Sequence, residues 1–327
     1  MGAPAPIEAI AVMNLLEALR YLAALDQHRH FGRAAQACRI TQPALSNAIR
    51  ALESELGVPV VRRSRQYEGL TAEGEVVLAH AHRLLSEAES LRQELHSRSL
   101  DPRGRLQIGA VPTAMPIATR FALRVRERHG GLAPVVRSLS SQEIETGIEN
   151  LSLDMGLGYI GRTQVGARAL QVWAQYDEAY YVVQRAGPPG ARLSVGEPMG
   201  WHEAAALPLT LLTPDMHNRT IVDQAFREAG ASVEAALETN SVLALVTALA
   251  AGPVAAVLPG ALVRSAQGIT GLQARPLVDP TVRTPIGFMT STGARGTPAL
   301  RAALVIAQDP PWLAEAAAHS GSLATAD

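Results

Sequence analysis

The sequence predicts an all-α N-terminal domain, a long connecting helix and a C-terminal α/β domain. A chain of 327 residues is long enough for about two domains. In the first hundred residues, apolar side chains recur every three or four positions, the spacing of amphipathic helices. From residue 103 onward, short apolar stretches alternate with helical stretches, which is typical of an α/β domain. We therefore expect domains at 13–71, 72–100 and 103–310.

The composition excludes several classes of protein. The chain is 47% hydrophobic and 18% charged, which is enough apolar material for packed cores and unlike a disordered chain. No apolar run reaches the roughly 18 residues of a membrane-spanning helix, and the N-terminal MGAPAPIEAI lacks the basic region of a signal peptide. The single cysteine, Cys38, excludes a disulfide framework and a cysteine-based zinc site. We expect a cytoplasmic protein without a membrane partner, metal or cofactor.

The charge is unevenly distributed, although the net charge is only −1. Every basic residue other than histidine is an arginine. Between Arg20 and Tyr67 the local net charge is +5. Because binding to phosphates needs a concentrated basic face rather than a basic chain, this segment is a candidate for contact with nucleic acid.

Three successive helices are predicted in this basic segment. Apolar spacing places the first at 13–27, a short alanine-rich second helix at 33–38, and a third at 43–56 that Gly57 ends. Thr41 is a plausible N-cap, and Pro43 stands where an early helical proline is tolerated. The second and third helices, joined by a tight turn, form a helix-turn-helix, in which the start of the third helix enters the DNA major groove.

The third helix has an apolar face and a polar face. Leu45, Ile49, Leu52 and Leu56 are predicted to be buried, whereas Gln42, Ser46, Asn47 and Arg50 project from the opposite side. Two strands at 58–61 and 69–71 are predicted to form a β-wing with a basic tip. The complete set of candidate DNA-binding residues is Arg33, Thr41, Gln42, Pro43, Ser46, Asn47, Arg50, Arg62, Arg63 and Arg65.

A long helix follows from 72 to about 99. Val77, Leu84, Leu91 and Leu95 form one apolar stripe along it. A stripe of this length on a single helix favours pairing with a second copy, so we expect a homodimer through residues 72–99.

The segment 34–78 resembles the winged helix-turn-helix of the LysR-type transcriptional regulators. The resemblance rests on the pattern QPALS-x-x-I-x-x-LE-x-x-LG, which begins at Gln42. Val61 departs from the phenylalanine usual in the wing, and Asn47 stands where arginine or glutamine is common. The resemblance implies double-stranded DNA as a partner, a homotetramer that bends the DNA, and altered access for RNA polymerase.

The remaining two-thirds of the chain alternates strands and helices. This order favours parallel sheets in two lobes. The C-terminal HSGSLATAD is predicted to be disordered. The predicted strands are 106–110, 135–139, 152–157, 179–183, 209–212, 254–258 and 286–289, and the predicted helices are 117–128, 142–150, 220–229, 242–250 and 298–307.

Thr113 lies between a predicted strand and the helix that follows it, where a hydroxyl and free N–H groups suit a small anion. LQIGAVPT, LDMGLGY and AAGPVAAVLPG resemble segments of LysR-type effector domains, which have two Rossmann-like subdomains like the type 2 periplasmic binding proteins. The resemblance implies subdomains at 103–172 with 280–310 and at 173–279, and a small-molecule effector in the cleft. The implied cleft residues are Thr113, Ser140, Ser141, Thr213, His217, Arg219, Asn240 and Ser241, with Arg219 expected to pair with an anion.

Other interpretations were weighed against this one. Gly156-Leu-Gly158-Tyr-Ile-Gly161 matches GxGxxG, but the residues after it do not look helical, which disfavours dinucleotide binding. His28 with His30, and His80 with His82, are spaced so that they point to different helix faces, which disfavours a metal site. An α/β enzyme or solute-binding protein sharing only the fold is the alternative, but neither has an evident need for the N-terminal hundred residues.

Overall fold

The structure is a computed structural model. The chain divides into two compact units, Met1–Arg92 with Asn150–Ser152 and Gln93–Glu149 with Leu153–Asp327. Across the parts of the chain that are described, no helix combines the length and apolarity needed to cross a membrane. The described residues are 14–63, 67–96, 102–162, 165, 170–186, 190–292, 296–320 and 323.

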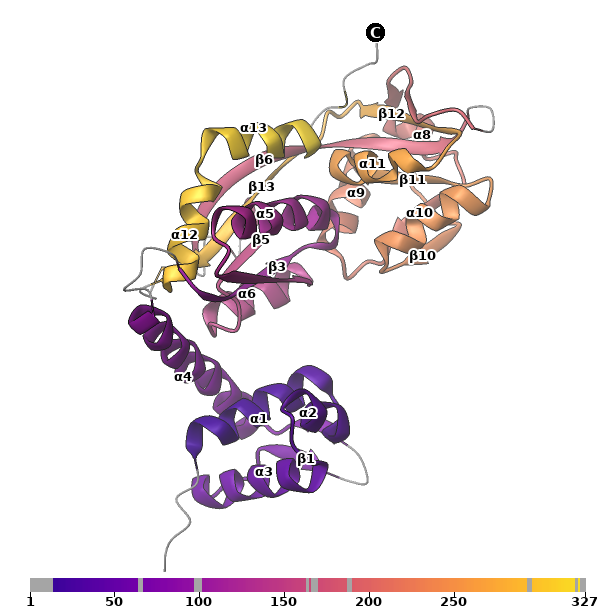
Figure 1. Ribbon diagram of the computed structural model, residues 1–327. Helices are drawn as coiled ribbons and strands as arrows, with labels where there is room; N and C mark the ends of the chain where they lie inside the picture. Colours follow the sequence, from indigo (N-terminus) through magenta and orange to yellow (C-terminus); the bar gives the residue numbers. More distant parts are fainter. Residues whose placement is uncertain are drawn as a thin grey trace, which may run out of the picture. The chain divides into compact units, whose positions relative to one another are not determined.

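The first unit confirms the predicted winged helix-turn-helix (Figure 1). Strands β1 and β2 pair antiparallel as the wing. The core is formed by apolar residues of the helices, among them Leu22, Leu25, Leu45, Ile49 and Leu52, all fully buried. The elements are α1 (Leu15–His28), α2 (Phe31–Ala37), α3 (Gln42–Leu56), β1 (Val61–Arg63), β2 (Tyr67–Leu70) and α4 (Ala72–His96).

Side-chain caps set where the helices begin. Thr41 caps α3 as predicted, since its Oγ1 accepts a hydrogen bond from the N–H of Ala44 at 3.3 Å. His30 caps α2, because its Nδ1 accepts the N–H of Gly32 at 3.0 Å and that of Arg33 at 3.3 Å. Helix α2 therefore begins at Phe31, two residues before the predicted start. The prediction missed this start because histidine is not among the usual N-cap residues.

The wing strands lie closer to the wing tip than predicted. The carboxylate of Glu53 accepts the N–H groups of Val60 and Val61 at 3.0 and 3.1 Å, which ties this segment to α3 instead of to a partner strand. Strand β1 thus starts at Val61, not at 58, and contains Arg62 and Arg63. Arg65, expected at the tip, lies outside the described residues.

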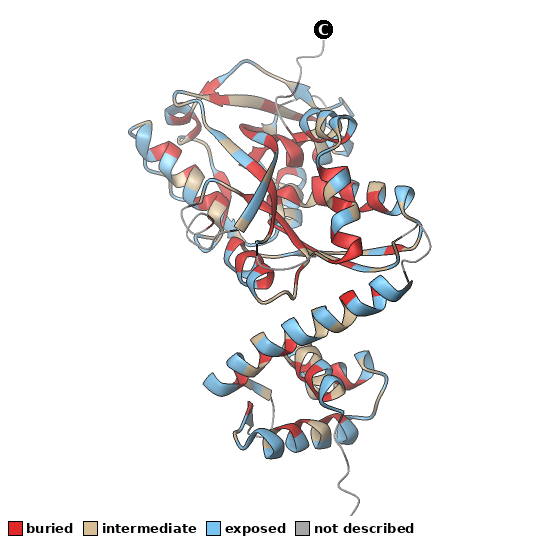
Figure 2. Ribbon diagram, turned by 90° about the vertical axis from the view of Figure 1, so that its left-hand side faces the viewer, coloured by how far each residue is buried: buried red, intermediate tan, exposed pale blue. Residues whose placement is uncertain are grey.

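Apolar side chains are exposed on two of the predicted helices. Leu56 is 42% exposed at the last position of α3, which corrects its predicted burial. Helix α4 is exposed along much of its length (Figure 2), and Leu84, Leu91 and Leu95 are 47%, 58% and 63% exposed. Val77, at the start of the same stripe, instead packs against the core of the first unit.

The second unit is an α/β structure with two lobes. In lobe I the sheet order is β4-β3-β5-β13-β6, with β3 parallel to both β4 and β5. Lobe I consists of β3 (Gly104–Ala110), η1 (Pro112–Ala114), α5 (Met115–Arg128), β4 (Leu132–Ser138), α6 (Ser141–Glu149), β5 (Met155–Tyr159), β13 (Arg283–Ser291), α12 (Pro298–Ala307), α13 (Pro310–Ser320) and the first part of β6 (Leu170–Arg185).

In lobe II the sheet order is β10-β9-β11-β6-β12, and β9 runs parallel to both β10 and β11. The strands β7, β8, β10 and β12 and the helices α8, α11 and α13 had no counterpart in the sequence prediction. Lobe II consists of β7 (Ser194–Val195), β8 (Met199–Gly200), α8 (Trp201–Ala204), β9 (Leu209–Leu212), α9 (His217–Glu228), β10 (Leu237–Thr239), α10 (Val242–Ala251), β11 (Ala255–Pro259), α11 (Gly260–Ser265), η2 (Ala266–Gly268), β12 (Leu272–Val278) and the last part of β6.

Strand β6 belongs to both lobes. Residues up to Ala179 pair with β13, and residues from Tyr180 onward pair with β11 and β12. These pairings are antiparallel, so the sheets, predicted to be parallel, also contain antiparallel pairs at the strands that connect the lobes. The β6–β13 ladder is irregular beside Gln175, because Tyr176 faces Ile286 while Ala174 faces Gly287.

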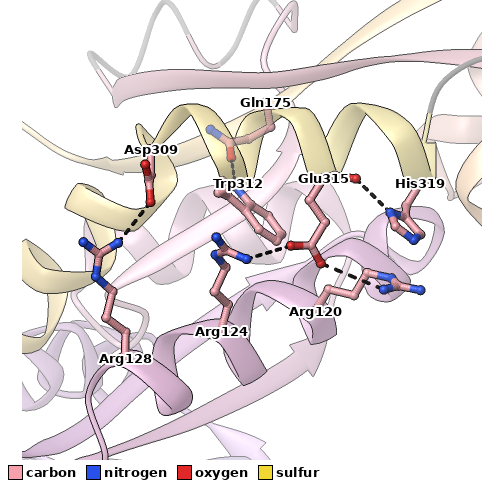
Figure 3. A network of polar contacts seen from close by, with 8 residues as sticks. All are labelled: Arg120, Arg124, Arg128, Gln175, Asp309, Trp312, Glu315 and His319. Atoms are coloured by element: carbon pink, nitrogen blue, oxygen red, sulfur yellow. Dashed lines mark hydrogen bonds and ion pairs between the residues drawn. The ribbon is translucent and has the colours of Figure 1, made fainter.

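The second unit continues beyond residue 310 with α13, which packs on α5 (Figure 3). Arg124 lies 3.0 Å from Glu315, and Arg128 lies 3.0 Å from Asp309. The indole N–H of Trp312, which is fully buried, donates to Oε1 of Gln175 at 2.6 Å. Of the C-terminal segment predicted to be disordered, His319 and Ser320 belong to α13, and Leu323 is buried with its N–H donating to the hydroxyl of Tyr181 at 2.7 Å. The other residues of that segment lie outside the described residues.

Candidate functional site

Helix α3 presents a polar face to solvent. Gln42, Pro43, Asn47 and Arg50 are exposed and Ser46 is half-buried, whereas Leu45, Ile49 and Leu52 fill the core behind them. A guanidinium N–H of Arg50 donates to Oδ1 of Asn47 at 2.8 Å, so the two side chains are held together one turn apart. This face has the amides and guanidinium that suit base edges and phosphates.

The other predicted DNA-binding residues are placed in different ways. Arg33 is exposed on α2, and Thr41 is exposed at the cap of α3. Nε of Arg62 donates to the carbonyl of Leu70 at 2.6 Å, so this side chain braces the two strands of the wing. Arg63 is in β1, but its side chain is not described.

The second unit contains a small pocket between its two lobes. Its free space is enough for about one water molecule. The lining residues lie at the end of a strand, just after one, or at the start of a helix. The lining residues are Val111, Pro112, Thr113, Ser140, Ser141, Tyr159, Leu212, Met216, His217 and Asn218.

The hydroxyl of Tyr159 is the centre of the pocket's hydrogen bonds. It lies 2.9 Å from Oγ1 of Thr113, also in lobe I, and accepts from Nδ2 of Asn218, in lobe II, at 3.4 Å. The ring of His217 packs edge-on against that of Tyr159, with centroids 4.9 Å apart. These contacts join the lobes across the pocket, so a molecule that enters it must meet both lobes.

The titratable side chains of the pocket are uncharged near neutral pH. Burial, together with the nearby Glu178, raises the pKa of Tyr159 well above its ordinary value. Burial, together with the positive charge of Arg162, lowers the pKa of His217 to about 4. Arg162 itself pairs with buried Glu145 at 2.8 Å. The pocket therefore offers neutral hydroxyl, amide and imidazole groups.

Three helices begin at the pocket. Helix α5 follows Thr113, α6 begins at Ser141, and α9 begins at His217. Ser140 and Glu143 cap α6 reciprocally, with Oε2 of Glu143 accepting the N–H of Ser140 at 2.8 Å. Neither α5 nor α9 receives a side-chain cap from the described residues. Because helix N-termini carry partial positive charge, their convergence favours electronegative atoms in the pocket.

The structure brings together only part of the predicted cleft. Thr113, Ser140, Ser141 and His217 line the pocket. Thr213 does not, although its hydroxyl is buried without a hydrogen-bond partner among the described residues. Asn240 and Ser241 are exposed, and Ser241 caps α10 through the N–H of Ala244.

The placement of Arg219 does not support its expected pairing with an anion. Its guanidinium lies outside the pocket lining and donates to the carbonyl of Leu212 at 2.7 Å. It also contacts the carboxylates of Asp223 and Glu238, each at 2.6 Å. The guanidinium of Arg219 is thus already hydrogen-bonded to groups of its own domain.

Sequence reasoning missed Tyr159, Met216 and Asn218. The signal available for Tyr159 was its position at the end of the strand beside the one that leads to Thr113. Of the residues in the other motifs, Gly156 and Gly158 lie inside strand β5, and His30 serves as a helix cap. Among the described residues, no three His, Cys, Asp or Glu side chains gather as a metal site.

Family models match both units. The model described as "Bacterial regulatory helix-turn-helix protein, lysR family" matches residues 16–75. The model described as "LysR substrate binding domain" matches residues 99–309.

Relatives with assigned names are transcriptional regulators. The probable hydrogen peroxide-inducible genes activator of Streptomyces viridosporus is 31% identical over 85% of this chain and 88% of that one. The DNA-binding transcriptional dual regulator OxyR of Escherichia coli K12 is 26% identical over 86% of this chain and 90% of that one. The SDS degradation transcriptional activation protein of a Pseudomonas strain is 41% identical, but over only 38% of this chain and 40% of its own length.

Solved structures share the fold of both units. A full-length OxyR variant from Pseudomonas aeruginosa is 22% identical and covers 93% of this chain and 95% of its own, with a TM-score of 0.63. CbnR in complex with its target DNA is 20% identical and covers 92% of this chain and 99% of its own, also with a TM-score of 0.63. With the family models, these findings show that the chain belongs to the LysR family and is a LysR-type transcriptional regulator with a helix-turn-helix and a substrate-binding domain.

Proposed function

We propose that this regulator binds specific DNA sites as a homodimer, or as a tetramer of two such dimers, through α3 of each copy. The exposed amide and guanidinium face of α3, opposite a fully buried apolar face, is the observation that carries the proposal. In this arrangement Gln42, Ser46, Asn47 and Arg50 contact base edges and phosphates in the major groove. Arg33 and the arginines of the wing supply contacts to the DNA backbone.

The exposed leucines of α4 support pairing between copies. Leu84, Leu91 and Leu95 recur at intervals of seven and four residues along α4 and are all exposed. A second copy of α4 buries these side chains, and residues 72–99 then set the distance between the two recognition helices. The protein acts in the cytoplasm, where a bacterial regulator meets the chromosome and RNA polymerase.

The effector in this proposal is a small molecule with an electronegative, oxygen-rich end, such as a small anion. The uncapped starts of α5 and α9 and the hydroxyls of Thr113 and Tyr159 support this class of ligand. Helix dipoles, not Arg219, supply the positive potential. A ligand that binds one arrangement of the lobes more tightly shifts the spacing of the recognition helices, and with it the DNA bend.

Thiol oxidation in the substrate-binding domain is not part of this proposal. Several relatives are named as hydrogen peroxide-inducible genes activators, but the single cysteine of this chain, Cys38, follows α2 in the DNA-binding unit. Burial raises the pKa of the Cys38 thiol, which keeps it in its less reactive protonated form. The signal is therefore expected to be a reversibly bound molecule.

Footprinting on the DNA upstream of the protein's own gene tests the DNA-binding part of the proposal. Wild-type protein should protect two half-sites separated by one or more helical turns. Ser46→Ala combined with Arg50→Ala should abolish this protection while the oligomer stays intact. Arg126→Ala removes an exposed arginine on α5 and serves as the matched control, which should protect like the wild type. Specific protection by the double variant would refute the role assigned to α3.

A further inference from the structure

Glu178 is a fully buried carboxyl group at the junction of the two lobes. Its exposed fraction is 0%, and it lies on β6 one residue before the point where the strand stops pairing with β13 and starts pairing with β11. Any change in the angle between the lobes must alter the backbone here, because β6 is continuous through both sheets. Glu178 thus lies where a change of charge acts on the strand that sets the angle between the lobes.

No side chain of opposite charge compensates this carboxyl among the described residues. Neither of its oxygens has a hydrogen-bond partner of good geometry there. The titratable groups that interact with it are the phenols of Tyr159 on β5 and of Tyr176 and Tyr180 on β6 itself. Across from it on β13 stands Thr284, which does not titrate.

The cationic side chains of this region are directed elsewhere. Arg283, which faces the residue after Glu178 on β13, is exposed. Arg162 of the pocket pairs with Glu145. Burial raises the pKa of Glu178 to about 8, opposed only in part by the hydroxyl of Tyr180. The carboxyl group is therefore protonated at neutral pH and loses its proton at slightly alkaline pH.

Glu178 is coupled electrostatically to the pocket through Tyr159. The carboxyl group is one cause of the raised pKa of the Tyr159 phenol, and the same phenol hydroxyl contacts Thr113 and Asn218 from the two lobes. An ionised Glu178 adds an uncompensated buried charge next to this contact.

We propose that Glu178 is a proton-binding site that links the protonation state of the lobe junction to the pocket. With the proton bound, Glu178 carries no charge and the lobes hold their contact at Tyr159. When the proton leaves for solvent, the negative charge loosens this contact and disfavours an anionic ligand in the pocket. The weaker binding of an anionic ligand rests on the proposed function. The proton binding at Glu178 and the weaker contact between the lobes at Tyr159 do not.

Infrared difference spectroscopy tests proton binding directly in the full-length protein. The spectrum of the wild type minus that of Glu178→Gln should show the carbonyl band of a protonated carboxylic acid at about pH 6 and lose it by about pH 9. Asp177→Asn is the matched control, because Asp177 is the exposed neighbour on the same strand. Its difference spectrum should lack the band. Absence of the band from the Glu178→Gln difference at about pH 6 would overturn the proposal.

Hydrogen–deuterium exchange tests the link to the pocket. Peptides covering 111–119, 155–160 and 216–220 should exchange faster in the wild type than in Glu178→Gln at about pH 9, and equally at about pH 6. Equal exchange of the two proteins at both pH values would overturn the coupling. Because this measurement uses the protein without ligand or DNA, its failure leaves the proposed function untouched, and a failed footprint leaves this result untouched.

Discussion

The burial of Glu178 predicts a steep loss of stability between weakly acidic and weakly alkaline pH. The pKa of this carboxyl is raised in the folded protein from its ordinary 4.5 to about 8. Between these values the folded state holds one proton more than the unfolded chain. The contribution of protonated Glu178 to the free energy of unfolding is fully present below the pKa of the unfolded state. It is lost as the pH rises through the pKa of the folded state.

The size of this loss follows from the linkage relation. Each pH unit in the window removes about 1.4 kcal/mol from the free energy of unfolding. Because the slope flattens as the pH approaches the folded pKa, raising the pH from about 6 to about 8 should cost roughly 2 kcal/mol, a substantial part of the 5–15 kcal/mol typical of a folded domain. Glu178→Gln has no proton to lose and should not show this loss.

Urea unfolding followed by circular dichroism at a series of pH values measures the effect. All other titrating groups are shared by the two proteins, so the difference between wild type and Glu178→Gln isolates this carboxyl. Asp177→Asn should follow the wild type. A difference between wild type and Glu178→Gln that stays constant from about pH 6 to about pH 8 would refute the reasoning.

Three further changes test other parts of the structure. Leu84→Glu with Leu91→Glu places charges in the exposed stripe of α4 and should convert the dimer to monomers at micromolar concentration in sedimentation velocity; an unchanged dimer would exclude α4 as the interface. Trp312→Phe leaves Oε1 of Gln175 without its buried donor and should lower the free energy of unfolding by about 1–3 kcal/mol in urea, whereas an unchanged midpoint would show that α13 is not anchored there. Thr113→Val should reduce the thermal shift caused by a binding anion without changing the affinity for DNA, and an undiminished shift would remove this hydroxyl from the ligand site.

The sequence was most informative where local pattern and tertiary structure agree. Periodic leucines, a threonine cap and a terminal glycine predicted α3 and its buried face nearly residue by residue. The wing strands were misplaced because the contact from Glu53 to Val60 and Val61 joins residues of different elements, and β-propensity does not report such contacts.

The site was less predictable than the fold because its members come from separate segments. Thr113 could be inferred from the order of strand, hydroxyl and helix. The sequence gives no sign that Arg219 is engaged, because its partner Glu238 lies on β10, a separate strand that brings the carboxylate to the guanidinium. Glu178 follows Asp177 in the chain, and only the direction of β6 decides that one carboxyl is buried and the other exposed.

The most direct test of a ligand-responsive DNA-binding regulator combines ligand binding and DNA protection in one footprint. Small carboxylates, phosphates and other oxyanions are first screened for thermal stabilisation, since a ligand at about 100 times its dissociation constant adds about 2.7 kcal/mol if it binds only the folded state. The footprint upstream of the protein's own gene is then recorded with and without the stabilising compound. We expect the spacing or extent of protection to change in the wild type and to remain unchanged in Thr113→Val. A stabilising compound that leaves the wild-type footprint unaltered would contradict the account.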